Sequence, residues 1–244
     1  MQEIPILFNG PMAKAVLDGR KTVTRRLVKG GQIPHLSPIE SEWPWTAVAQ
    51  YDPRYGFVVS ARTEQECAEL LGIHGESPYG RPGDRLWGRE AWAADQQLDG
   101  VAPRDMSHGE PIVYLADNAL RQTGCAMITK GKTRPSIHMP RWASRIELEV
   151  TERRIERLQA ITEDQAIAEG LVVTGEVNGR VLYSASTPAP IPAGTQQVFT
   201  PSGTDAISAF RQLWESTGGD WASNPWVWVV EFKRVEAASG RVAA

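Results

Sequence analysis

The stretch "RIELEVTERRIERL", residues 145–158, carries the clearest strand pattern in this 244-residue chain. Ile146, Leu148 and Val150 alternate there with polar residues. Because successive side chains of a strand point to opposite faces, this alternation predicts a half-buried strand. A second stretch, "NPWVWVVEFKRV" at 224–235, is rich in aromatic and β-branched residues, which predicts a strand in the core sheet.

Short helices and further strands are predicted around these two stretches. Asn9 can cap a first helix and Gly19 can end it. Thr162 and Gln165 have capping-box spacing, and Gly170 can end the one or two helical turns that follow. The other predicted elements are a hairpin within 47–61, a helix over 63–72, a strand beginning at Leu86 after the corner at 82–84, a strand over 111–117 and a helix over 204–219.

The order of these elements predicts a mixed α+β fold. Strands separated by short, irregular helices, without regular βαβ alternation, favour a small, largely antiparallel barrel or sheet with flanking helices. Residues at about 30–80 and 172–203 are rich in turn-forming residues and are interpreted as two insertions, the second of them flexible. We therefore expect a single domain over 1–236 and a frayed tail over 237–244.

The composition excludes several classes of protein. The chain is 41% hydrophobic, enough for a core, yet no apolar run approaches the ~20 residues of a membrane-spanning helix. No secretory signal pattern occurs at the start, so we expect a cytoplasmic protein with no membrane partner. Cys67 and Cys125 lack CxxC spacing, the four histidines lack metal-binding spacing, and no phosphate-binding glycine motif occurs. We expect neither a metal nor a cofactor.

The net charge of −3 hides two basic segments. Residues 14–29, which include "LDGRKTVTRR" at 17–26, hold six cations opposed only by Asp18; residues 126–146 hold five cations and no acidic residue. If the fold brings the two segments together, they form a patch that attracts a phosphate or a carboxylate. Otherwise each is a solvated face, and the cations at 20 and 21 compensate the dipole at the end of the first helix.

Four motifs in order along the chain resemble the ASCH domain family. They are "GRKTVTR" at 19–25, "PGDRL" at 82–86, the short helix at 158–170 and the aromatic strand at 226–235. The resemblance implies a β-barrel similar to the PUA domain, in a form similar to the larger, Trp-rich ASCH proteins of phages and prophages. It also implies that a cleft between the barrel and the first helix binds a nucleoside or nucleic acid.

One bacterial branch of this family is an amidohydrolase that removes the acyl group from N4-acetylcytidine and related N4-acylated cytosines. It uses a lysine, a threonine and a glutamate, and the resemblance assigns these roles to Lys21, Thr24 and Glu169. Amide cleavage without a metal needs a nucleophile, a base and a group that holds the oxyanion. Thr24 would be the nucleophile. Lys21 would be the base if burial, Arg25 and, more weakly, Arg20 lower its pKa. Glu169 would orient the lysine or carry a proton to the leaving amine.

Further side chains are candidates for substrate binding. The spacing of Lys21 and Thr24 places both on one side of a helical turn or tight loop. Strand alternation turns either Arg89 or Glu90 toward the interior, where it lines the cleft or forms a structural ion pair with the basic motif. Tryptophans can stack on bases. The expected substrate-binding residues are Arg20, Arg25, Arg26, Trp87, Arg89, Glu90, Trp92, His138 and Trp142.

Two alternatives to the amidohydrolase stay open at this point. The first is a non-catalytic reader of RNA or modified DNA, which would bind polynucleotides in a salt-sensitive way because phosphate contacts release counterions. The second is a ribonuclease, which the lack of paired histidines disfavours.

Overall fold

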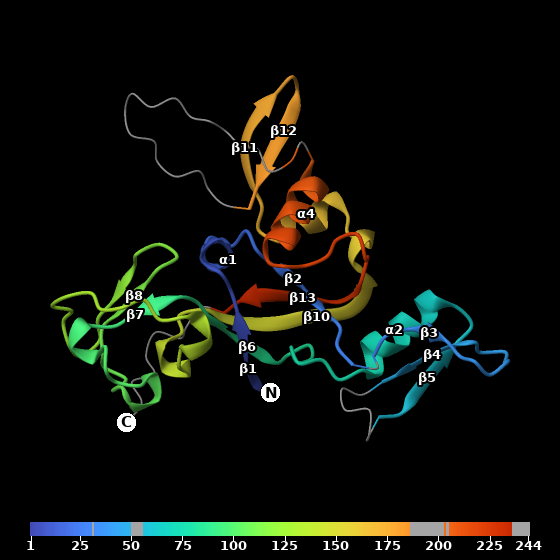
Figure 1. Cartoon of the computed structure of the whole chain (residues 1–244), viewed down its shortest axis with the longest axis horizontal. Helices are drawn as coiled ribbons and strands as arrows, with labels where there is room; N and C mark the ends of the chain where they lie inside the picture. Colours follow the sequence, from blue (N-terminus) through green and yellow to red (C-terminus); the bar gives the residue numbers. More distant parts are fainter. Residues whose placement is uncertain (31, 50–55, 186–202, 204, 236–244) are drawn as a thin grey trace.

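The computed structural model describes residues 1–30, 32–49, 56–185, 203 and 205–235. Its centre is a five-stranded sheet in the order β1-β6-β10-β13-β2 (Figure 1). Strands β1 and β6 are parallel and the other neighbours are antiparallel. No closed barrel is found among the described residues, because β1 and β2 end the order as edge strands. The sheet strands are β1 (Glu3–Leu7), β2 (Val23–Leu27), β6 (Arg85–Arg89), β10 (Glu147–Arg157) and β13 (Trp226–Arg234).

The two stretches with the strongest strand patterns pair with each other at the centre of this sheet. Val150 of β10 lies opposite Phe232 of β13, and the register shifts at a bulge between Val150 and Glu152. Both predictions are confirmed. Strand β13 packs against an apolar cluster on each face, with Trp228 in one cluster and Val229 in the other. This explains why the sequence of β13 is continuously apolar while β10 alternates.

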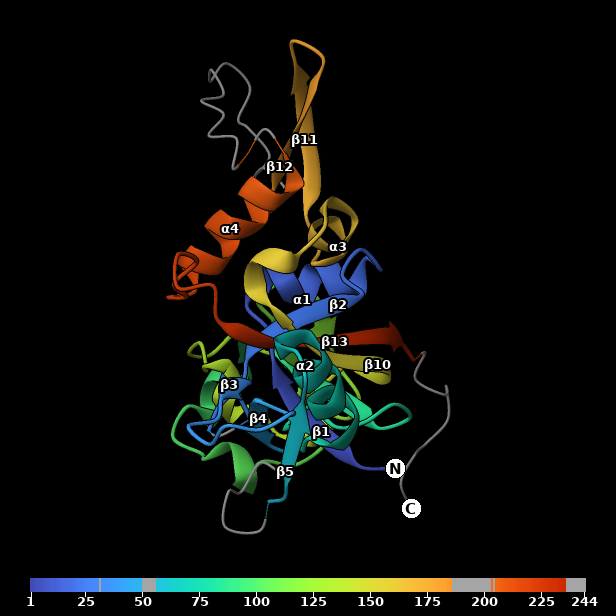
Figure 2. The same cartoon turned by 90° about the vertical axis from the view of Figure 1, so that its right-hand side faces the viewer.

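Three of the predicted helices have side-chain N-caps, and the first two of these caps were expected from the sequence. Helix α1 (Gly10–Leu17) begins with the Asn9 side chain accepting from the Met12 backbone N–H. Helix α3 (Glu163–Ala168) has the capping box, and helix α4 (Ala206–Ser216) is capped by Asp205. Helices α3 and α4 lie together over one face of the sheet (Figure 2) and share the cluster that contains Val229.

Two lobes lie at opposite ends of the central sheet (Figure 1). One contains β3 (His35–Leu36), β4 (Trp45–Val48), β5 (Val58–Ala61) and α2 (Glu64–His74). It shares the apolar cluster of the central sheet, so the predicted hairpin and helix of the first insertion are confirmed, with the hairpin turn at 50–55 outside the described residues. The other, the β7–β9 lobe, contains β7 (Trp92–Ala93), β8 (Ile112–Tyr114) and β9 (Leu120–Arg121) around its own cluster.

The remaining elements are short. The 3₁₀ helices are Gln96–Leu98, Pro103–Asp105, Ser136–His138, Arg141–Ala143 and Leu158–Ala160. Across the part of the chain that is described, no helix has the length and apolar character needed to cross a membrane.

The described part of the second predicted insertion contains regular structure. Residues 172–184 form a hairpin of β11 (Val172–Val177) and β12 (Arg180–Ser184), which projects beyond α4 in both views (Figures 1 and 2). Asn178 and Gly179 form its turn with φ of 52° and 75°, the conformation that an Asn-Gly turn favours. Residues 172–184 therefore form regular strands, which the turn-rich composition did not predict, while their flexibility stays a prediction. Residues 186–202 and the predicted tail at 237–244 lie outside the described residues.

Gly170 allows the end of α3 to approach the end of α1. Its φ is +102°, and a Cβ there would lie 2.8 Å from the Cβ of Ala15 and 3.0 Å from the Cβ of Lys21. The position therefore requires glycine both for backbone conformation and for space.

Replacing Gly170 should destabilise the fold more than replacing a glycine that has only the backbone requirement. We expect Gly170→Ala to lower the free energy of unfolding by about 2–5 kcal/mol, because a left-handed backbone and overpacking both add to the cost. Gly179→Ala is the matched control, since its φ is +75° with no atom within 4 Å of the added Cβ. It should cost only about 1–2 kcal/mol in urea unfolding. Equal losses would show that crowding at Gly170 is unimportant.

Candidate functional site

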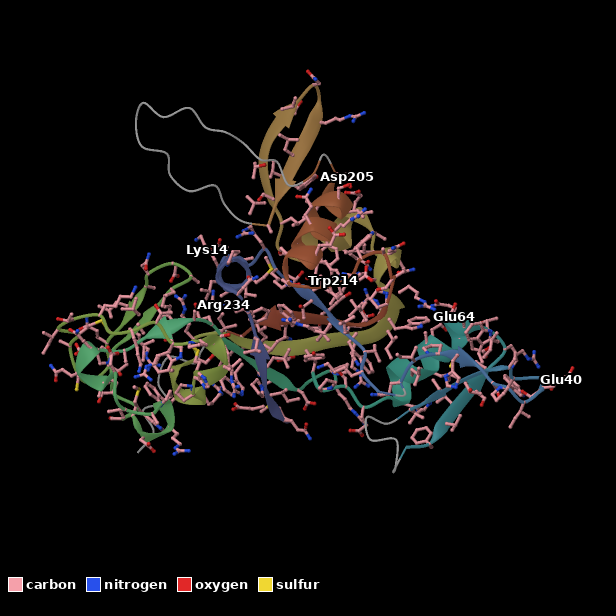
Figure 3. The ribbon with its side chains drawn as sticks, in the orientation of Figure 1. Lys14, Glu40, Glu64, Asp205, Trp214 and Arg234 are labelled. Atoms are coloured by element: carbon pink, nitrogen blue, oxygen red, sulfur yellow. The ribbon has the colours of Figure 1, made fainter. Side chains whose placement is uncertain are left out.

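A cavity of about 480 Å³ lies along the outer edge of β2. The start of α1 and the last turn of α4 form its walls; Figure 3 labels Trp214 at the end of α4 nearest the sheet. Polar lining residues are Asn9, Lys21, Thr24, Arg25, Arg26, Lys29, Tyr79, Ser136, Glu169 and Thr217. The remaining lining residues are Leu7, Phe8, Met12, Leu27, Phe210, Leu213, Trp214, Gly218 and Gly219.

Lys21 and Glu169 form a buried ion pair in this cavity. Each residue is only 3% exposed, although they lie 148 residues apart in the chain. The Lys21 Nζ donates to Glu169 Oε2 at 2.5 Å, to the Glu169 carbonyl at 3.0 Å and to the Val23 carbonyl at 2.8 Å. A lysine ammonium has three protons, so these bonds satisfy it completely.

The local backbone explains how this pair forms. After α1 ends, the Lys21 N–H donates to the Ala15 carbonyl, and the Thr22 N–H donates to the Ala168 carbonyl at the end of α3. Lys21 and Glu169 thus make an antiparallel backbone bridge as well as a side-chain pair. The ends of α1 and α3 are held together at the point where β2 begins.

Burial lowers the pKa of Lys21 below the ordinary lysine value, and it is the largest influence on this group. The Glu169 carboxylate opposes the shift, while the charges of Arg26 and Arg25 add to it. Arg20 was expected to contribute but does not: its guanidinium donates to the Gly170 carbonyl at 2.6 Å and pairs with Asp18. Arg26 therefore makes the contribution to the lowered pKa of Lys21 that was expected from Arg20.

Arg25 connects the ion pair to α3. Its buried guanidinium donates to Glu169 Oε1 at 3.4 Å, to Gln165 Oε1 at 2.7 Å and to Glu156 Oε2 at 3.4 Å. The Glu169 carboxylate consequently lies between two cations, Lys21 and Arg25. Gln165 Oε1 accepts hydrogen bonds both from the Thr162 backbone N–H, within the capping box of α3, and from the Arg25 guanidinium. The capping motif predicted from the sequence is therefore also part of the site.

Thr24 lies in β2, where it is 3% exposed and faces Val230 in the register. It does not lie in a helical turn or tight loop, as the spacing from Lys21 suggested. Both residues line one cavity because Lys21 precedes the strand, where the chain still turns out of α1. Within the described ranges the Thr24 hydroxyl has no hydrogen-bond partner, so it is available to a ligand.

Several predicted binding residues lie away from the cavity. Glu90 is buried in a bidentate pair with Arg145 at 2.8 and 2.9 Å, so its partner is not the basic motif at 17–26. Trp92 is fully buried in the β7–β9 lobe. Five others lie outside the cavity lining: Arg20, Trp87, which Arg89 covers, Arg89 itself, Trp142, which stacks on His108, and the exposed His138.

The second basic segment does not join the first at the cavity. Only Ser136 from residues 126–146 lines it. Arg145 also pairs with Asp117, and Arg141 pairs with Glu3 and Glu147. In this segment, most cationic side chains with described contacts therefore form ion pairs that stabilise the fold.

Sequence reasoning missed the apolar wall that α4 presents to the cavity. Phe210, Leu213 and Trp214 form it, and Arg25 lies 5.9 Å from the centre of the Phe210 ring. Trp214 is buried, with 8% of its surface exposed. The amphipathic pattern of α4 identifies its buried face, but not that this face also borders a cavity.

Among the described residues, no group of three or more His, Cys, Asp or Glu side chains could hold a metal ion. The centre of the candidate site therefore combines the Thr24 hydroxyl and the Glu169 carboxylate with several cations. No protein-family model matches this chain, and no curated protein or solved structure is significantly similar to it.

Removing the buried carboxylate should destabilise the protein strongly. Glu169→Gln leaves Lys21 and Arg25 without their shared anion, so we expect a loss of about 3–5 kcal/mol in the free energy of unfolding. Asp164→Asn is the control on the same helix; Asp164 is exposed and only favours the helix dipole, so it should cost less than about 1 kcal/mol. Similar losses in chemical denaturation would argue against a strongly coupled pair.

Proposed function

We propose that this protein is an ASCH-type amidohydrolase that removes the acyl group from N4-acylated cytosines such as N4-acetylcytidine. The observation that carries the proposal is the buried Lys21–Glu169 pair beside an unpartnered Thr24 hydroxyl in one cavity. Under this proposal the central sheet corresponds to the PUA-like barrel. The phage-type ASCH resemblance is part of the same proposal, and so is a cytoplasmic location, where cytidine nucleosides and RNA occur.

The reaction would begin with a proton transfer inside the ion pair. Ligand binding excludes water from the cavity, which disfavours two separate charges. A proton would then pass from Lys21 Nζ to Glu169 Oε2 across the 2.5 Å contact, leaving a neutral amine and a neutral carboxylic acid. The lowered pKa of Lys21 supports this step.

The neutral amine would next activate the threonine. Lys21 Nζ takes the proton of Thr24 Oγ1 while this oxygen attacks the acyl carbon, and a tetrahedral oxyanion forms. When the bond between the acyl carbon and N4 breaks, Glu169 gives its proton to N4, so the free cytosine amine leaves and the acyl group stays on Thr24. Water then attacks this ester and gives one proton to Glu169, while Lys21 returns a proton to Thr24. A final transfer from Glu169 to Lys21 restores the resting pair.

The open edge of β2 offers a donor for the oxyanion. Phe232 donates to the Thr22 carbonyl and Val28 donates to the Trp226 carbonyl, which fixes the hydrogen-bonded positions of this strand pair. In an antiparallel pair these positions alternate, so the N–H groups of Arg25 and Leu27 point away from β13. We assign the Arg25 N–H, next to Thr24, as the donor that stabilises the developing charge.

A non-catalytic reader of RNA or modified DNA is the second candidate. It is favoured by the complete hydrogen bonding of the Lys21 ammonium, which suits a stable structural pair, and by the excess of cations in the cavity. The two candidates differ in whether an acylated cytosine is consumed.

Incubation with N4-acetylcytidine, followed by chromatography of the released cytidine, tests the enzymatic proposal. We expect release by the wild type and a loss of about a thousandfold or more in kcat for Thr24→Ala, because the nucleophile is removed. Thr24→Ser keeps the hydroxyl and should retain measurable activity. Thr22→Ala is the neighbouring control, since Thr22 is exposed and does not line the cavity. Absence of release at high protein concentration would leave the reader as the better account.

The pH dependence of kcat/KM should follow the protonation of the Lys21–Glu169 pair. Lys21 acts as base only when neutral, and its lowered pKa increases the neutral fraction at any given pH. The rate should therefore rise with pH, with a midpoint below the ordinary lysine value of about 10.4 that belongs to the Lys21–Glu169 pair. Lys21→Arg cannot lose its proton and should abolish the rise. A wild-type midpoint at or above the ordinary value would count against Lys21 as the base.

A further inference from the structure

Positive charge exceeds negative charge in the part of the cavity that follows β2. Lys21, Arg25, Arg26 and Lys29 line it, and Glu169 is the single carboxylate among its described lining residues. Glu169 is already paired with the first two cations. The excess positive charge therefore belongs to Arg26 and Lys29, at the end of the cavity farther along the strand.

Neither of these cations forms an ion pair with a described residue. In the described part of the chain, no carboxylate pairs with Arg26 or with Lys29. Arg26 donates one bond, from Nη2 to the Leu7 carbonyl at 2.7 Å, and its Nε is buried without a partner. Lys29 is exposed. A partly buried guanidinium with unused donors is suited to a planar or tetrahedral oxyanion.

The start of α1 adds to the positive field at this end. Arg26 is held at Leu7, two residues before the Asn9 cap, and both Leu7 and Asn9 line the cavity. The first turn of α1 contains no acidic residue that would oppose the helix dipole. Three independent sources of positive potential therefore meet on the α1 side of the cavity.

The register of β2 relates this region to the proposed nucleophile. Thr24 pairs with Val230 and Arg26 with Trp228, so the two side chains leave the same face of the strand. Two residues of strand span about 7 Å. This separation suits a ligand whose pyrimidine ring reaches Thr24 while a group on its sugar reaches Arg26.

We propose that the ligand of this cavity carries a phosphate, which Arg26 and Lys29 bind while the base lies at Thr24. The inference rests on the proposed function for the identity of the base. It narrows the ligand class from a free nucleoside to a phosphorylated one, either a cytidine 5′-nucleotide or a cytidine within a phosphodiester chain. The shared chemistry is a phosphate oxyanion bound by a guanidinium and an ammonium.

Calorimetric titration with cytidine, cytidine 5′-monophosphate and a cytidine trinucleotide tests this proposal without turnover. We expect the wild type to bind at least one phosphorylated ligand about tenfold or more tightly than cytidine, because charge-assisted hydrogen bonds form only with the phosphate. The preference should weaken as NaCl is raised. A stronger gain for the monophosphate identifies a nucleotide ligand, and a stronger gain for the trinucleotide identifies a polymer.

Charge-removing variants then locate the phosphate. Arg26→Gln with Lys29→Gln should reduce the preference to about threefold or less, since both oxyanion partners lose their charge. Arg180→Gln removes one charge from the exposed β11–β12 hairpin and should leave the preference unchanged. Lys29→Gln alone, at an exposed position, should still lower the preference if the double variant does not fold.

The outcomes separate this inference from the proposed function. Equal wild-type affinity for cytidine and both phosphorylated ligands overturns the inference, as does a preference that survives in the folded double variant. Release of cytidine from N4-acetylcytidine without any phosphate preference overturns the inference alone. A phosphate preference without release from either N4-acetylcytidine or its 5′-monophosphate overturns the amidohydrolase and supports the inference.

Discussion

The buried charge cluster of Lys21, Glu169 and Arg25 is the interaction on which the arrangement of the site depends. A charge removed from water is tolerated only where an opposite charge and hydrogen bonds compensate it. Here one carboxylate serves two cations, and the lysine ammonium is completed by two backbone carbonyls. The end of α1, the edge strand β2 and the end of α3 are therefore fixed relative to one another, and glycine at 170 provides the space for it.

This cluster has a second consequence, because it forms one wall of a cavity instead of lying in a closed core. The same burial that demands pairing also lowers the pKa of Lys21 below the ordinary lysine value. The wall from α4 is apolar, and at the far end of the cavity Arg26 and Lys29 have no carboxylate partner among the described residues. A ligand with an apolar ring and an anionic substituent complements both regions, whether the protein acts on the ring or only binds it.

The charges of the β7–β9 lobe pair with one another. In the β7–β9 lobe Arg145 lies between Glu90 and Asp117, and its guanidinium lies 4.0 Å from the centre of the Tyr114 ring. These groups satisfy one another, so the acid-free run at 126–146 contributes stability to the lobe and little charge to the cavity. A basic segment in a sequence is thus informative about a ligand only after its internal partners are known.

The sequence by itself determined the elements whose signals are local: the alternating strand β10, the apolar strand β13, the capped helices and the glycine at which α3 ends. It also contained an Asn-Gly turn signal for the β11–β12 hairpin, although the surrounding turn-rich composition obscured it.

Lys21, Thr24 and Glu169 were selected through a resemblance, since no local pattern relates residues 148 positions apart. Only the tertiary structure decided that Glu90 pairs with Arg145 and that Arg26, not Arg20, influences Lys21. It also decided that the buried face of α4 borders a cavity. The physical reason is that hydrogen-bond caps and strand periodicity act over a few residues, whereas burial and electrostatic pairing depend on distances that the chain path alone does not fix.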